Sequence, residues 1–298
     1  MSADLLPAGW RWESYRDVEV AVPVDWGHEN GSQRVHQWCI WEGPTHPAVG
    51  RPGVTTAVGC MEGAGQVPHP STRVDRLGTF VAFEAALGPA EQQETTEGDR
   101  TTVRAGVVEV LVQAEPTLRR RIVDSIRHIS VDANGCPVSE PISQNPGRRP
   151  HPAADVTRLS GVRAVSACKY SLQEGLNDNR LTGPTLVSSL RLEAEAATQA
   201  VAAIKAAPLG GGPDNPDQCL PEVSFGDEAI VLTVTSDQGT SVIYLRYSGC
   251  DHNGFDDGVN RRALTKEAVT PFITGPNMIT SGFSASANKV DILAPDTG

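Results

Sequence analysis

Residues 229–247 read Ala-Ile-Val-Leu-Thr-Val-Thr-Ser-Asp-Gln-Gly-Thr-Ser-Val-Ile-Tyr-Leu-Arg-Tyr. Two runs rich in β-branched residues, 229–235 and 241–247, flank a polar segment whose glycine permits a tight turn. This pattern predicts a β-hairpin. It indicates that the second half of the chain contains an antiparallel sheet.

The rest of the second half alternates between strand and helix patterns. Period-two alternation predicts strands near 162–170 and 185–192. Apolar residues at helical spacing predict a helix over 193–207, with glutamates at its start and Lys205 at its end, as the helix dipole favours. A short helix over 265–274 is expected after the N-cap candidate Thr265.

The first half combines predicted strands with one late helix. Val-Glu-Val-Ala-Val at 18–22 alternates apolar and polar residues and stops at Pro23, which is typical of a strand that ends at a turn. After Pro116, apolar residues recur at three- and four-residue spacing and predict an amphipathic helix over 117–129. Further strands are predicted at 54–60, at 77–86 and as a pair that flanks Gly98-Asp99, whose second strand covers 101–113.

The length of 298 residues favours two domains. Residues 137–155 contain five prolines and few apolar residues, a composition typical of an extended, semi-rigid linker. We therefore expect an α+β protein of two domains, each an antiparallel sheet packed by one or two helices. The expected boundaries are 1–136 for the first domain, 137–156 for the linker, 157–276 for the second domain and 277–298 for a mobile tail.

Six cysteines without a CxxC spacing favour structural disulfides in an oxidising compartment. They are Cys39, Cys60, Cys136, Cys168, Cys219 and Cys250. In the first domain Cys39 and Cys60 are each other's only candidates. The other four allow three connectivities, of which we favour Cys168–Cys219 with Cys136–Cys250, so that the linker is tied to the end of the hairpin. Free buried thiols are the alternative.

The cysteines predict an extracellular or cell-envelope protein. The first residues, Met-Ser-Ala-Asp-Leu-Leu-Pro, lack the charged and apolar regions of a secretory signal, so this prediction requires a signal or anchor outside this chain. Reduced thiols in a cytosolic protein are the alternative. The net charge of -11 argues against binding to nucleic acid or to anionic membranes, and no apolar stretch is long enough for a spanning helix.

Two resemblances agree with this location. Trp12–Tyr15, the run Val-Glu-Val-Ala-Val-Pro-Val-Asp-Trp at 18–26 and the Ile-Val-Asp-Ser-Ile-Arg-His-Ile segment from Ile122 resemble the PsbP-like α/β/α sandwich domains of bacterial envelope lipoproteins. Asn134–Pro137, Ala167–Tyr170, Ala206–Pro208 and Tyr247–Gly258 are similar to a group of uncharacterised secreted or membrane-anchored actinobacterial proteins. The resemblances imply an envelope location and a sandwich fold in the first half, and they imply no activity.

The densest polar segment is Cys250-Asp-His-Asn-Gly-Phe-Asp-Asp-Gly258. Oxygen atoms of Asp251, Asn253, Asp256 and Asp257 are the ligands that a hard cation such as calcium prefers, although the spacing is not that of an EF-hand. A structural turn, in which Asp and Asn side chains bind nearby backbone amides, is the favoured interpretation. With His252, the same residues are our candidate for recognition of a ligand or partner. The sequence suggests no cofactor other than calcium.

All five tryptophans fall within the first 41 residues, and Trp10 and Trp12 share one face of a predicted strand. Core packing is the favoured role, and stacking on sugars or apolar ligands is the alternative.

We find no specific catalytic motif. The sequence therefore favours a non-enzymatic binding or interaction protein with an envelope or extracellular ligand. The alternative is a metal-dependent hydrolase that uses the loop 251–258.

Overall fold

The computed structural model describes residues 6–28, 47–52, 78–172, 183–219, 224–279 and 292. The chain divides into two compact units, residues 1–130 and 131–298. Sheets dominate both units, and short helices accompany them, so the fold is broadly α+β and mostly β.

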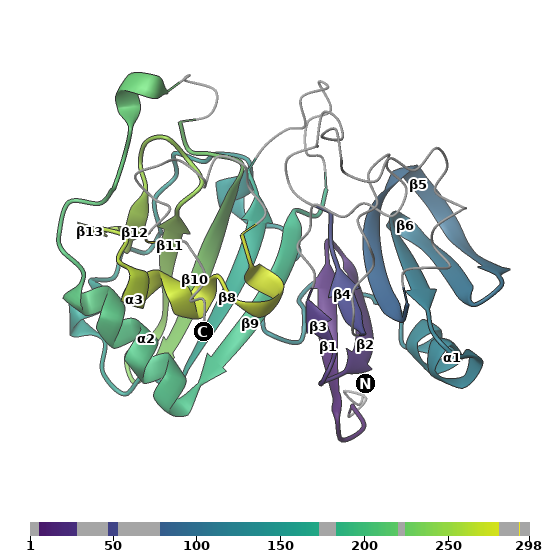
Figure 1. The fold of residues 1–298 in the computed structure, drawn as a ribbon. Helices are drawn as coiled ribbons and strands as arrows, with labels where there is room; N and C mark the ends of the chain where they lie inside the picture. Colours follow the sequence, from purple (N-terminus) through teal and green to yellow (C-terminus); the bar gives the residue numbers. More distant parts are fainter. Residues whose placement is uncertain are drawn as a thin grey trace. The chain divides into compact units, whose positions relative to one another are not determined.

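The first unit contains two sheets (Figure 1). In one, β2 lies between β1 and β7, and both pairs are antiparallel. In the other, of order β3-β4-β5-β6, the β3–β4 and β4–β5 pairs are parallel and β5 forms a hairpin with β6. The strands are β1 Trp10–Tyr15, β2 Val18–Pro23, β3 Gly27–His28, β4 Ala48–Gly50, β5 Phe80–Glu97, β6 Arg100–Gln113 and β7 Arg127–His128. The strands predicted at 18–22, 77–86 and 101–113 are confirmed.

Helix α1, Pro116–Asp124, is shorter than the predicted 117–129. The Glu115 carboxylate caps it by accepting the N–H groups of Thr117 and Leu118. At the other end Ser125 Oγ donates to the Ile122 carbonyl and accepts the Ala21 N–H of β2, which fixes the end of the helix on that strand. The isoleucines beyond Ser125 follow the helical spacing, but the chain there turns into β7 and pairs with β2.

Alternation along β1 separates two environments. One face carries Tyr15, which packs in the core of the unit, and Glu13, which is 4% exposed. The Glu13 carboxylate binds Arg51 Nη2 at 2.5 Å, Arg11 Nε at 2.6 Å and His28 Nε2 at 2.8 Å. Since His28 belongs to β3 and Arg51 follows β4, this cluster joins the two sheets. The other face carries Trp10 and Trp12.

The second unit contains one antiparallel six-stranded sheet of order β13-β12-β11-β10-β8-β9. The predicted hairpin is confirmed as β10 and β11, in which Ser236 pairs with Gly239 at the turn. The strands predicted near 162–170 and 185–192 are confirmed as β8 and β9. The bounds are β8 Ala164–Ser171, β9 Leu186–Glu193, β10 Glu228–Ser236, β11 Gly239–Arg246, β12 Gly254–Asp256 and β13 Arg261–Arg262.

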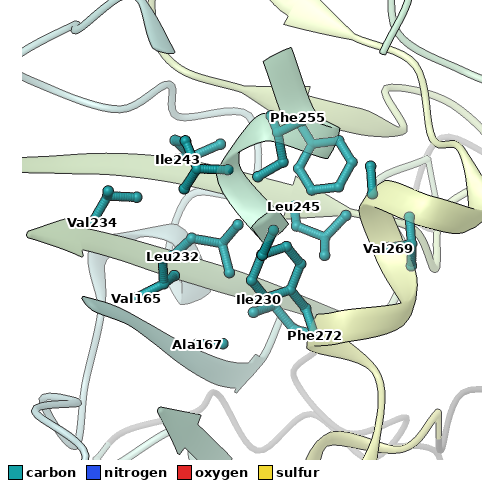
Figure 2. Close-up of a cluster of buried hydrophobic side chains, with 14 of the residues drawn as sticks. Val165, Ala167, Ile230, Leu232, Val234, Ile243, Leu245, Phe255, Val269 and Phe272 are labelled. Atoms are coloured by element: carbon teal, nitrogen blue, oxygen red, sulfur yellow. The ribbon is translucent and has the colours of Figure 1, made fainter. Parts of the chain in front are cut away.

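Two helices cover one face of this sheet. Helix α2, Ala194–Ala206, and helix α3, Lys266–Val269, extended by a 3₁₀ turn over Thr270–Phe272, pack on the side chains of β8, β10, β11 and β12. Figure 2 shows Phe255 and Phe272 against Leu232 and Leu245 in this core. Burial of one such phenylalanine stabilises the fold by about 1.5–3 kcal/mol. Thr265 caps α3 as predicted, since its side chain accepts the Ala268 N–H.

The opposite face is covered by the proline-rich segment 137–156. Ile142 is fully buried there beside Tyr170 and Tyr244 of the sheet. The Tyr170 hydroxyl donates to the Pro137 carbonyl at 2.7 Å. The segment expected to be an extended linker is thus a covering layer of the second unit. Its prolines indicated irregular backbone, and the composition gave no sign that this backbone is buried.

The disulfides are Cys136–Cys168 and Cys219–Cys250, each with a Cα–Cα distance of 5.5 Å. The favoured pairing of Cys168 with Cys219 and of Cys136 with Cys250 is therefore wrong. Cys219 pairs with Cys250, which follows β11. Cys168 lies on β8, which β10 separates from β11, so Cys168 is not next to this pair. Cys136 reaches Cys168 because Asp132 accepts the Asn134 and Cys136 N–H groups and folds the chain back.

Several predictions concern residues outside the described part of the chain. These are the pair Cys39 and Cys60, the strand at 54–60, the tryptophans Trp38 and Trp41, and most of the tail 277–298.

Candidate functional site

The aspartate-rich turn 251–258 follows β11 and contains β12. Asp256 lies on β12 and is 1% exposed. Its carboxylate binds Arg149 Nη2 at 2.7 Å, Arg261 Nε at 3.5 Å and Arg246 Nη1 at 3.6 Å. Burial alone would raise the pKa of Asp256, but the hydrogen bonds from Arg149 and Gly258 and the charges of the arginines hold it below its usual value.

Asp257 organises the backbone of the turn. Its Oδ1 accepts N–H groups of Val259 at 2.8 Å and Asn260 at 2.6 Å, and its Oδ2 accepts the Val156 N–H at 2.9 Å. The Gly258 Cα site is tight as well, since a Cβ there would lie 2.7 Å from the Pro150 carbonyl oxygen. Asp257 thus holds both the turn and the covering segment 137–156 in place.

The remaining polar residues of the turn are Asn253, Asp251 and His252. The Asn253 amide donates to Asp214, Pro213 and Gly249, while its Oδ1 is buried without a hydrogen-bond partner among the described residues. Asp251 accepts the His252 N–H, and the His252 ring stacks on Phe225 with a centroid distance of 4.4 Å.

These contacts favour the structural interpretation of the turn. A calcium ion takes about six to eight oxygen ligands. The oxygens of Asp256 and Asp257 already bind arginines and backbone amides of their own unit. Within the ranges that the structure describes, no three His, Cys, Asp or Glu side chains are grouped as metal ligands would be.

A second site lies on the tryptophan face of β1. Trp10 and Trp12 line a hollow of about 340 Å³ together with the end of α1 and the chain that follows it. We call this the tryptophan hollow. Its lining residues are Leu6, Pro7, Trp10, Trp12, Ala21, Arg121, Asp124, Ser125, Ile126 and Arg127. The prediction that Trp10 and Trp12 share a face is confirmed.

Each indole of the hollow carries a guanidinium on its ring. Arg121 Cζ lies 4.1 Å from the Trp10 ring centroid, and Arg127 Cζ lies 3.8 Å from that of Trp12. Such cation–π contacts fix the position of a long side chain that would otherwise be mobile. The hollow therefore combines apolar ring surface with positioned hydrogen-bond donors.

The charges around the hollow are unequally compensated. Arg127 Nη2 binds the buried Glu19 carboxylate at 2.8 Å, and Asp124 is held by Arg120 of the same helix. Arg121 is exposed, and no ion pair or hydrogen bond of its guanidinium occurs among the described residues. Arg120 also binds Glu94 at 2.9 Å. Among the described residues, Arg121 is therefore the arginine of the lining whose guanidinium has no carboxylate partner.

Sequence reasoning found the tryptophans of this site and missed its arginines. The arginine run Arg119–Arg121 is too short to indicate nucleic-acid binding, and by itself it indicates no site. Arg121 reaches Trp10 from the end of α1, and Arg127 reaches Trp12 from β7. The second contact depends on the pairing of β7 with β2, and a helix predicted to continue to residue 129 leaves no room for that strand.

Comparison of the chain with models of protein families, with curated proteins and with solved structures finds no match. Among the described residues no helix has the length and apolar character needed to cross a membrane. The two disulfides are consistent with an extracellular location, because such bonds persist in oxidising compartments.

Proposed function

We propose that this chain is a non-enzymatic binding protein of the extracellular space or cell envelope, and that it binds a glycan at the tryptophan hollow. The observation that carries the proposal is the hollow itself, in which two indoles of one strand face stand beside positioned guanidinium donors. Apolar ring faces flanked by a few fixed polar groups are typical of small-molecule sites.

The two disulfides support the extracellular part of the proposal, because such bonds persist outside the cytosol. We include in this proposal the resemblance of the first half to PsbP-like domains and of the whole chain to envelope proteins. The charge of -11 supports a partner other than nucleic acid.

The aspartate-rich turn gives the hydrolase alternative less support. Asp256 and Asp257 would need free oxygens to hold a metal or to move a proton. Their contacts instead join β12 to Arg149, Arg246 and the backbone of the turn.

The proposal is tested by titrating the full chain with neutral and acidic sugars while following tryptophan fluorescence. We expect binding to change the emission, and Trp10→Leu or Trp12→Leu to weaken it by about tenfold or more, since aromatic anchors in a pocket contribute about 1.4 kcal/mol or more. Circular dichroism verifies that each variant is folded.

Asp251→Ala, in the other unit, is the matched control and should leave sugar binding unchanged. If no sugar binds, or if both tryptophan variants bind as the parent protein does, the glycan-binding proposal is wrong.

A further inference from the structure

Among the described residues the Arg121 guanidinium has no carboxylate partner, and this restricts the kind of ligand that fits the tryptophan hollow. The other charged groups of the lining are paired, Arg127 with Glu19 and Asp124 with Arg120. A ligand with one negative charge would supply the partner for the Arg121 guanidinium.

The stacking on Trp10 prepares Arg121 for this role. With Arg121 Cζ at 4.1 Å from the Trp10 ring centroid, the side chain has already lost much of its rotational freedom before a ligand arrives. A planar guanidinium presents paired N–H donors that match the two oxygens of a carboxylate. A lysine would supply the charge without this geometry.

The size and lining of the hollow indicate the rest of the ligand. A volume of about 340 Å³ is near the lower end of small-molecule sites, so it suits one or two sugar units. Leu6, Pro7 and Ile126 supply apolar walls beside the indoles. The overall charge of -11 disfavours a long polyanion, which the rest of the surface would repel.

We propose that the tryptophan hollow recognises an acidic sugar, with the ring against the indoles and its carboxylate on Arg121. This inference rests on the proposed function, since it specifies the class of glycan bound. It makes Arg121 the residue that distinguishes acidic sugars from neutral ones.

The experiment compares methyl β-D-glucuronide with methyl β-D-glucoside, which share the ring and differ in the carboxylate. Binding to the full chain is measured by tryptophan fluorescence and by saturation-transfer NMR. We expect the glucuronide to bind more tightly. Arg121→Gln should weaken glucuronide binding by about tenfold to a hundredfold, as for loss of a charged hydrogen bond, and weaken glucoside binding much less, because the glucoside has no carboxylate for Arg121 to bind.

Two further variants complete the test. Arg121→Lys should recover only part of the glucuronide affinity, because it restores charge without paired donors. Arg119→Gln removes a half-buried arginine of the same helix that does not line the hollow, and should change neither affinity.

The outcomes separate this inference from the proposed function. If both glycosides bind equally and Arg121→Gln affects neither, the acidic-sugar inference is wrong while glycan binding stands. If neither glycoside binds, both fail. If acetate binds as tightly as the glucuronide, the sugar ring contributes nothing, and the acidic-sugar inference is overturned.

Discussion

The aspartate-rich turn of the second unit and the tryptophan hollow of the first both concentrate polar groups, but they use them differently. In the turn, the carboxylate oxygens of Asp256 and Asp257 bind arginines and backbone amides of the same unit. In the hollow, Arg121 lies on an indole with no ion pair among the described residues. A dense polar segment marks a binding site only when its hydrogen-bonding capacity is left for a partner.

The difference follows from how each group is buried. A buried charge must be paired within the protein, because an unpaired one costs several kcal/mol. An exposed guanidinium on a tryptophan face keeps its hydration, so it needs no partner to be stable. Burial therefore commits Asp256 to a structural role, whereas exposure leaves Arg121 available for a ligand.

The largest expected effect is the loss of the Asp256 carboxylate. Asp256→Ala leaves Arg246, which is 1% exposed, without this carboxylate, so that its guanidinium retains the carbonyls of Pro146 and Arg148 and the rings of Phe225 and Tyr244. We expect the second unit to lose about 3–5 kcal/mol of unfolding free energy, as for the breaking of a buried ion pair. Amide hydrogen exchange of the β10–β11 hairpin measures this loss.

Asp251→Ala is the matched control within the same turn. The Asp251 side chain is 34% exposed, and among the described residues its carboxylate binds only the adjacent His252, so its removal should have a small effect. Equal losses in the two variants would contradict the structural role assigned to Asp256.

A smaller effect is expected at Glu13, the buried carboxylate of the first unit. Burial would raise the pKa of Glu13, but Arg51, His28 and Arg11 together hold it well below its usual range. Its stabilisation is therefore complete above the unfolded pKa of about 4.3 and is lost as the pH falls through the lower folded value.

Glu13→Gln should destabilise the first unit by about 1.5–3 kcal/mol at neutral pH and make its stability less sensitive to acid. Urea unfolding followed by tryptophan fluorescence reports on this unit alone, because all five tryptophans lie in the first 41 residues. A variant with the same acid sensitivity as the parent protein would show that Glu13 is not the titrating group.

Strands that alternate cleanly could be predicted from the sequence. The hairpin of β10 and β11, together with β2, β8 and β9, follows from local periodicity and from turn residues such as Gly239. Features that depend on distant pairing could not. The end of α1 depends on the contact of Ser125 with Ala21, and the connectivity of Cys168 depends on the order of strands in the sheet.

The two candidate sites show the same limit. Asp251–Gly258 could be recognised as an Asx-rich turn, but Arg149, which binds Asp256, is 107 residues away in the sequence. Trp10 and Trp12 could be placed on one strand face. The hollow beside them depends on where the end of α1 lies relative to β1, and this position cannot be predicted from composition and spacing.

The smallest expected effect is on stability at the hollow. Arg121→Gln removes an exposed cation–π contact and should reduce the unfolding free energy of the first unit by about 0.5–1 kcal/mol at most. Arg127→Gln should cost more, because Arg127 both stacks on Trp12 and donates to the buried Glu19 carboxylate. Urea unfolding by tryptophan fluorescence compares the two. If Arg121→Gln proves the more destabilising, Arg121 is committed to the fold as Asp256 is, and the contrast between the hollow and the turn does not hold.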